Sequence, residues 1–324
     1  MGGCLQKKVL NKSNKIALNY IVGIIVAAIL FWSIWAQVKQ QLAGTHFSWQ
    51  VLSQNFPLLL LAVLLLPINI LIESKRWQSV SCKAQNISFK ESMQSVLCGI
   101  AFSIITPNRI GEYPGRIIFL KRKNIVRFIA VAILAVLAQL LVFVVLGSLG
   151  FLYFHSLYFT IVFKRYWILL VALLVLFLAT FFFYEKWIVW FQKFSFFQRY
   201  ETYTYLLQKF SFKEQITVLG LTILRVFVFS TQLVLLLWWN EISISFLDGL
   251  LMAFVFFLTI AVIPSFAFAE LGIRGKMSLV LFAPVTSNAI GIVLATFMLW
   301  CINLLLPALV GYFFLLKNRL LKKK

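Results

Sequence analysis

Long apolar runs separated by short basic loops dominate this chain. Six runs reach the length of about 20 residues that a helix needs to cross a bilayer. They are Ile16–Val38, Phe56–Ser74, Phe128–Phe154, Tyr166–Tyr184, Gln215–Trp239 and Ala289–Leu316. The runs do not alternate apolar and polar positions as barrel strands do. The pattern therefore predicts an all-α polytopic membrane protein with about six spanning helices in a single integral membrane domain, residues 1–324.

Two further apolar stretches are too short to span and are interrupted by proline and glycine. The first follows a capped helix start at Ser88–Glu91 and has basic residues on both flanks. It predicts a re-entrant hairpin, about 88–120, that enters from the cytoplasm and returns there. The second, about 246–286, predicts a hairpin that opens to the outer side. The alternative is that 246–263 spans fully and that 277–285 recrosses the membrane.

The two interruptions share a pattern in which an arginine follows a glutamate after four residues. The first pair is Glu112 and Arg116, and the second is Glu270 and Arg274. The residues expected to break the helices are Pro107, Gly111, Pro114, Gly115, Pro264 and Gly272. Two related breaks in opposed orientation are typical of inverted-repeat transporters, whose broken helices hold substrate near the midplane.

The net charge of +21 changes the expected topology rather than the class of protein. Lysines and arginines collect in loops that stay in the cytoplasm, so both termini are predicted to be cytoplasmic in a cell (cytoplasmic) membrane. No nucleic-acid motif accompanies the charge, so nucleic acid is not expected as a partner. The basic and aromatic segment 185–214 predicts an amphipathic element on the cytoplasmic face.

Cysteine and histidine do not form a metal or disulfide pattern. The cysteines lack metal-ligand spacing, and the two histidines are far apart: Cys4, Cys82, Cys98, Cys301, His46 and His155. No metal and no cofactor are expected.

Charges inside the bilayer cost about 2.5–3.5 kcal/mol each on insertion scales, so they must pair or line a wet cavity. Glu112 with Arg116, and Glu270 with Arg274, have the spacing of helical ion pairs. Arg109 is an additional arginine that these two ion pairs do not account for. The surplus positive charge favours an anion site, since arginine matches phosphate oxygens bidentately.

Three more polar residues fall inside predicted spans. Arg225 either snorkels to the cytoplasmic surface or belongs to the substrate path, on the helix face that also carries Phe229. Gln139 and Asn303 are expected to form hydrogen bonds between helices.

The segment from Pro107 to Arg116 resembles the conserved block of the lysylphosphatidylglycerol synthase transmembrane family, a flippase-type region also called UPF0104. Pro264 to Arg274 resembles the second motif of that family, and Arg76-Trp77 also fits. The resemblance implies inverted hairpins that move lipids between leaflets. By matching position it implies a functional set of Arg109, Glu112, Arg116, Glu270 and Arg274. In that family the second motif usually has a Gly-Gly-Leu-Gly-like run before its acidic residue, and much of this run is replaced in the present chain.

These observations lead to three hypotheses. The first is a lipid flippase or lipid transporter, not an enzyme, that binds an anionic or aminoacylated phospholipid head group between the two hairpins. The second is an intramembrane transferase acting on lipid-linked substrates. The third is a non-catalytic scaffold, with a partner enzyme docked at the cytoplasmic face.

Overall fold

The computed structural model describes residues 55–106, 111–117, 125–158, 167–193, 201–263 and 267–321, together with Trp32 and Trp35. Every regular element in this part of the chain is a helix, which confirms the all-α fold of a multi-pass membrane protein. The first predicted span, 16–38, lies outside the described residues apart from its two tryptophans.

Within the described ranges, four helical stretches are long and apolar enough to cross a membrane. They are Phe56–Ser81, Arg127–Phe154, Phe212–Trp239 and Ala289–Leu316. The first is α3, the second belongs to α6 (Ile125–Tyr158), and the third is α10. The fourth joins α13 (Ala289–Trp300), a π-helical turn η4 (Cys301–Leu305) and α14 (Leu306–Leu321). α3 extends seven residues beyond the predicted end at Ser74. Several residues of these last turns are buried, which shows that the end of the helix packs against other parts of the protein.

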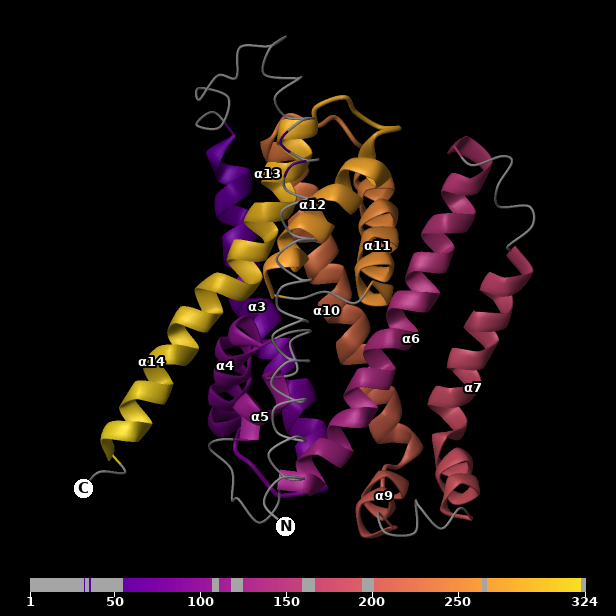
Figure 1. The fold of residues 1–324 in the computed structure, drawn as a ribbon, viewed down its shortest axis with the longest axis vertical. Helices are drawn as coiled ribbons and strands as arrows, with labels where there is room; N and C mark the ends of the chain where they lie inside the picture. Colours follow the sequence, from indigo (N-terminus) through magenta and orange to yellow (C-terminus); the bar gives the residue numbers. More distant parts are fainter. Residues whose placement is uncertain are drawn as a thin grey trace, which may run out of the picture.

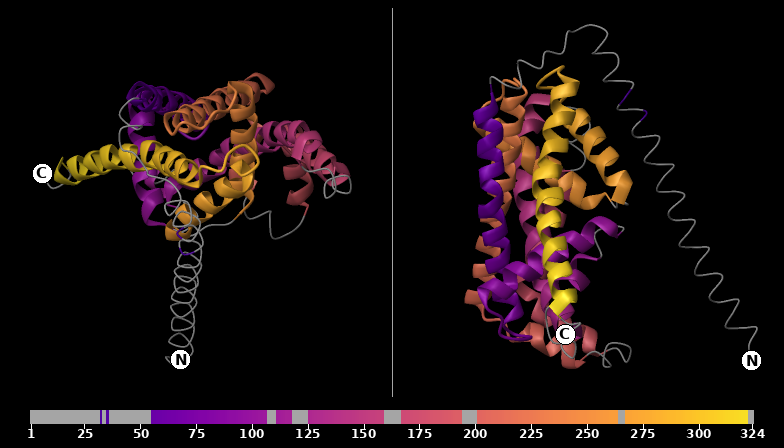
Figure 2. Two further views of the ribbon diagram at one scale, coloured as in Figure 1. Left: turned by 90° about the horizontal axis from the view of Figure 1, so that it is seen from above. Right: turned by 90° about the vertical axis from the view of Figure 1, so that its left-hand side faces the viewer.

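The remaining helices are α4 (Phe89–Ile105), α5 (Glu112–Ile117), α7 (Trp167–Gln192), α9 (Glu201–Gln208), α11 (Phe246–Val262) and α12 (Ala267–Phe282). In Figure 1, α4 and α5 occupy the lower half of the molecule, whereas α11 and α12 occupy the upper half. α6 and α7 form one edge, and the lower half of α14 extends away from the other helices on the opposite side (Figures 1 and 2).

Helix ends follow local chemistry. Ser88 and Glu91 form a complete capping box at the start of α4, as the sequence predicts. α4 and α11 end at Thr106 and Ile263, whose backbones are extended, and each precedes a proline. Proline clashes with a helical residue before it, so both helices stop there. Pro107 and Pro264 themselves lie outside the described residues.

Three of the expected breaks are not breaks. Pro114 and Gly115 lie inside α5, and Gly272 lies inside α12. Pro114 occupies the first turn of α5, where its missing N–H has no intrahelical partner to lose. Gly115 serves close packing instead, because a Cβ there would lie 2.8 Å from the carbonyl oxygen of Cys98 on α4. Gly111 does lie at the turn before α5.

The predicted cytoplasmic segment 185–214 is divided among several elements. α7 continues to Gln192 after non-helical backbone angles at Phe183, α9 covers 201–208, and α10 begins at Phe212. Around α9, Leu206 and Phe210 are buried while Tyr205 is exposed. The docking of a partner enzyme on this segment stays a prediction.

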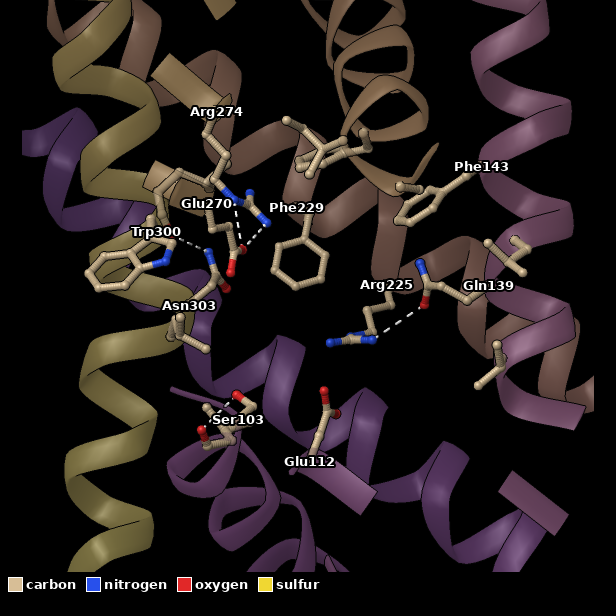
Figure 3. Close-up of a pocket in the computed structure, with 18 of the residues that line it drawn as sticks. Ser103, Glu112, Gln139, Phe143, Arg225, Phe229, Glu270, Arg274, Trp300 and Asn303 are labelled. Atoms are coloured by element: carbon tan, nitrogen blue, oxygen red, sulfur yellow. Dashed lines mark hydrogen bonds and ion pairs between the residues drawn. The ribbon is translucent and has the colours of Figure 1, made fainter. Parts of the chain in front are cut away.

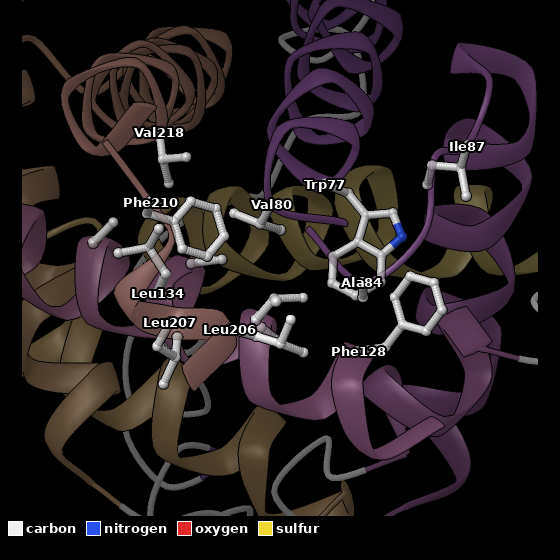
Figure 4. Packing of buried hydrophobic residues seen from close by; sticks show 14 of the residues in the cluster. Trp77, Val80, Ala84, Ile87, Phe128, Leu134, Leu206, Leu207, Phe210 and Val218 are labelled. Atoms are coloured by element: carbon white, nitrogen blue, oxygen red, sulfur yellow. The ribbon is translucent and has the colours of Figure 1, made fainter. Parts of the chain in front are cut away.

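Two apolar clusters lie at opposite ends of the bundle. One surrounds Trp77 and joins α3, α6, α9 and α10; Figure 4 shows Phe128 and Phe210 among its members. The other joins α10, α11, α12 and α13 around residues such as Phe256. Along α10 the first cluster includes Val218 and the second begins at Leu233, and Arg225 lies between them next to Val226 of a third, smaller cluster. Polar side chains of the bundle collect in that interval.

Candidate functional site

A cavity of about 500 Å³ lies where the two apolar clusters leave room, and both glutamate–arginine motifs reach it. Glu112 of α5 lines it from below in Figure 3, and Glu270 and Arg274 of α12 line it from above. Arg225 and Gln139 approach from α10 and α6. The structure therefore brings Glu112 and Arg274, which are 162 positions apart in the sequence, to the same cavity. The volume is within the usual range for small-ligand sites.

Arg116 does not line the cavity but lies directly behind it, with 3% of its side chain exposed. It forms an ion pair with Glu112 on the same helix, as the spacing predicts. Its guanidinium also lies 5.0 Å from the ring centre of Trp77. Arg109, the other arginine of this motif, lies outside the described residues.

The centre of the polar cluster is Glu73, whose side chain is 2% exposed. Three arginines from three helices form ion pairs with its two oxygens, and Arg76 and Arg116 also donate hydrogen bonds to Oε1. Arg76 approaches to 2.8 Å, Arg116 to 2.6 Å and Arg225 to 3.0 Å. A buried carboxylate is stable only when paired and hydrogen-bonded, and here one anion holds α3, α5 and α10 together.

The sequence analysis missed the role of Glu73 and Arg76, since Glu73 lies at the end of the predicted span and Arg76 lies beyond it. The helix actually continues to Ser81, which leaves Glu73 about 12 Å from its end at 1.5 Å per residue. The signal that could have identified them is a Glu and an Arg three positions apart, on one face of a long apolar helix. The family resemblance pointed only to Arg76-Trp77.

The second motif forms an ion pair within α12. Arg274 donates from Nε at 2.9 Å and from Nη2 at 2.8 Å to Glu270 Oε1. The side chains are 16% and 10% exposed, so this pair is less enclosed than the Glu73 cluster. The ion-pair geometry that the sequence suggests is thus present in both motifs.

Arg225 belongs to the cavity wall and does not snorkel to the surface. Its Nε donates to Asn69 Oδ1 at 3.1 Å, and its Nη1 donates to Gln139 Oε1 at 3.4 Å. The ring of Phe229 lies 5.0 Å from the guanidinium. Its Nη2 makes no hydrogen bond to any described residue, and Figure 3 shows one end of the guanidinium directed into the cavity.

A chain of amides runs from Arg225 across the bundle. Asn69 donates to Asn303 Oδ1 at 2.7 Å, Asn303 donates to Gln232 Oε1 at 2.9 Å, and Gln232 donates to the carbonyl of Ala62 at 2.8 Å. Because arginine can only donate, Arg225 fixes which end of Asn69 accepts and so orients each amide after it. The predicted hydrogen bonding of Gln139 and Asn303 between helices is confirmed, and both side chains also line the cavity.

Asn303 lies in the π-helical turn η4. A π turn inserts one residue into an α-helix, and such turns occur frequently at functional sites. Here it divides the last span beside the cavity and presents an amide to α3 and α10 together. Among the described residues, no three His, Cys, Asp or Glu side chains are close enough to hold a metal ion.

The geometry defines a polytopic membrane protein with a charged cavity between apolar helices. The family comparison makes this more specific: the model described as the lysylphosphatidylglycerol synthase TM region matches residues 20–321. The chain therefore belongs to that family, which confirms the family that the sequence resembles. A comparison with curated proteins gave no match.

Proposed function

We propose that this protein is a transporter that binds a lipid head group in the central cavity and moves it between leaflets. The observation that carries the proposal is the convergence of both glutamate–arginine motifs and Arg225 on one cavity between apolar helices. Charged side chains at membrane depth are costly, and they are typical of substrate pathways. Membership of a lysylphosphatidylglycerol synthase TM family supports a lipid-related role.

The proposed topology has six spans and two re-entrant hairpins. The first hairpin comprises α4 and α5, and the second comprises α11 and α12. The placement of these pairs in opposite halves of the molecule supports an inverted arrangement (Figure 1). Both α4 and α11 end at the residue before a proline, which supports a common hairpin design. We further propose cytoplasmic termini in the cell membrane.

In this mechanism Arg225 contacts the head group, and Glu73 positions Arg225. Arg116 is already bound by two carboxylates, so it stabilises the first hairpin rather than contacting the lipid. Arg225 has a donor directed into the cavity. The lipid tails stay in the bilayer while the head group crosses a polar cavity, which avoids the cost of placing its charge in hydrocarbon.

The test is a lipid-flipping assay in proteoliposomes with a fluorescent phospholipid. We expect Arg225→Gln to reduce the rate by at least about tenfold, since a hydrogen bond to a charged group contributes roughly 1.5–3 kcal/mol. Arg127→Gln, the same change at an exposed position of α6, is the matched control and should keep the wild-type rate. Equal rates in protein-containing and protein-free vesicles would refute the transport proposal.

A further inference from the structure

We infer, on the basis of the proposed lipid transport, that the π turn η4 is a hinge. At this turn the last span bends when the two hairpins move relative to each other and change the side to which the cavity opens. The inference rests on how the two halves of the span are attached to the bundle, and on the proline that follows the turn.

The half before the turn is attached to the second hairpin. The hydroxyl oxygen of Thr296 on α13 lies 3.4 Å from that of Ser278 on α12. Ile292 and Leu299 of α13 are buried in the same apolar cluster as Phe282 of α12. α13 therefore follows α12 when the second hairpin moves.

The half after the turn is attached to the first hairpin. α14 packs against α4, and a Cβ at Gly311 would overlap the carbonyl oxygen of Leu97 on α4. The thiol of Cys98 on α4 donates to the carbonyl oxygen of Gly311 at 3.4 Å. Because the two backbones touch, α14 moves together with α4. Figure 1 shows this division, with α13 among the upper helices and α14 running down on the side of α4.

The turn itself is held by α3 and α10, which belong to neither hairpin. Asn303 accepts from Asn69 of α3 at 2.7 Å and donates to Gln232 of α10 at 2.9 Å. The same amide donates to the carbonyl oxygen of Leu299, one turn earlier in the span, at 3.2 Å. α3 and α10 also pack against each other. The fixed point of the bend therefore lies at Asn303, between two halves that different hairpins carry.

Pro307 explains why the span bends at this point. Proline has no N–H, so the carbonyl group of Asn303, four residues earlier, has no α-helical donor, and the proline ring clashes with it. The π turn lies directly before the proline, and the N–H of Leu306 donates to the carbonyl oxygen of Cys301, five residues earlier. Sharp helix kinks occur at prolines and at π-bulges, and this span has both side by side. A bend here therefore disrupts fewer hydrogen bonds than a bend elsewhere in the span.

A bend at the hinge changes the cavity directly. Trp300, the last residue of α13, and Leu304, within the turn, both line the cavity. The indole Nε1 of Trp300 is buried without a hydrogen-bond acceptor among the described residues, so no such bond fixes the ring in its present position. Movement of α13 therefore carries this ring along the cavity wall.

The experiment restores the missing backbone donor. Pro307→Ala supplies an N–H and removes the clash with the Asn303 carbonyl, so the straight helix gains a hydrogen bond. In the proteoliposome flipping assay with the full-length chain, we expect Pro307→Ala to lower the rate by about two- to tenfold, which is the effect of one ordinary hydrogen bond. The Tm should stay equal or rise. Pro67→Ala, the same change inside the continuous helix α3, is the matched control and should keep the wild-type rate.

A second measurement does not depend on transport. Spin labels are attached at Val280 of α12 and Phe313 of α14, which are both exposed, in a chain whose four native cysteines are replaced by alanine. In nanodiscs of phosphatidylglycerol and phosphatidylethanolamine, double electron–electron resonance should give more than one distance for this pair. Pro307→Ala should reduce the distribution to a single distance. Labels at Val280 and Phe297, which both lie on the second hairpin's side of the turn, should give a single distance throughout.

The outcomes separate the hinge from the transport proposal. A wild-type flipping rate in Pro307→Ala, or a single Val280–Phe313 distance that this substitution leaves unchanged, overturns the hinge and leaves lipid transport standing. Flipping no faster than in protein-free vesicles overturns the transport proposal. In that case, two Val280–Phe313 distances that Pro307→Ala reduces to one still support the hinge.

Discussion

Glu73→Gln removes the only carboxylate that pairs with Arg76 and Arg225 in the described part of the chain. The substitution keeps the size of the side chain and one acceptor oxygen, so it tests charge rather than packing. Arg116 keeps its pair with Glu112, but two arginines are left without a carboxylate. Breaking a buried ion pair from one side typically costs about 3–5 kcal/mol, because the remaining charge stays buried.

We therefore expect Glu73→Gln to lower the free energy of unfolding by about 3–5 kcal/mol. In a thermal unfolding experiment in detergent this corresponds to a fall in Tm of roughly 4–7 °C for a chain of 324 residues. Glu241→Gln makes the same chemical change at an exposed residue and should leave Tm within about 1 °C. The contrast between the two variants separates the buried charge from a general effect of losing a carboxylate.

A double-mutant cycle makes the reasoning refutable. Removing Arg225 together with Glu73 eliminates one of the stranded cations. The double variant should then be less destabilised than the sum of the single variants, by about 1–3 kcal/mol. If Glu73→Gln unfolds at the wild-type temperature, or if the two losses simply add, then Glu73 does not organise the three arginines and the positioning role proposed for it is wrong.

Three further predictions test packing, topology and the amide chain. Gly115→Ala should destabilise the α4–α5 contact by about 1–3 kcal/mol, because its Cβ would lie 2.8 Å from the Cys98 carbonyl oxygen. Gly220→Ala is the control, because a Cβ at this position of α10 has no atom within 4 Å, and it should stabilise the helix by up to about 1 kcal/mol. Equal Tm shifts in the Gly115→Ala and Gly220→Ala variants would contradict the packing argument. In a variant with Cys82 as the sole cysteine, this thiol should react with a membrane-impermeant maleimide only from the cytoplasmic side. Because burial raises the pKa of the thiol, its reaction rate should keep rising with pH beyond the range in which a free cysteine is already deprotonated. Labelling from outside would invert the topology. Asn303→Leu should lower the free energy of unfolding by about 2–4 kcal/mol, because it leaves two buried amide partners unsatisfied. It should also weaken lipid binding although Arg225 is unchanged. Unchanged Tm and unchanged lipid binding would show that the amide chain is not structural.

Local rules predicted the helices well and the site only in part. Apolar length gave α3, α6, α10 and the last span, and the capping box gave the start of α4. These features depend on residues near one another in the chain. The same holds for the pair Glu270 and Arg274, whose spacing alone implies contact. Arg225 was identified as a candidate because an arginine inside an apolar span needs an explanation.

What the sequence could not provide is the depth of each residue and its distant partners. Glu73 reads as the polar end of a span, since nothing local shows that α3 continues for two more turns among other helices. Gly115 reads as a helix breaker, because its contact with α4 exists only after folding. The π turn at Cys301–Leu305 lies within a continuous apolar run, in which Pro307 indicates a disturbed helix but not the type of turn.

The two motifs are equivalent in sequence but not in energetics. Arg116 is 3% exposed and bridges Glu112 to Glu73, so replacing it would remove the ionic contact between α5 and α3, although Glu73 would keep Arg76 and Arg225. Arg274 is 16% exposed and pairs with Glu270 on its own helix, and both side chains line the cavity, whereas Arg116 does not. The first motif therefore acts chiefly as a tie between helices, whereas the second remains adjustable where a head group would enter.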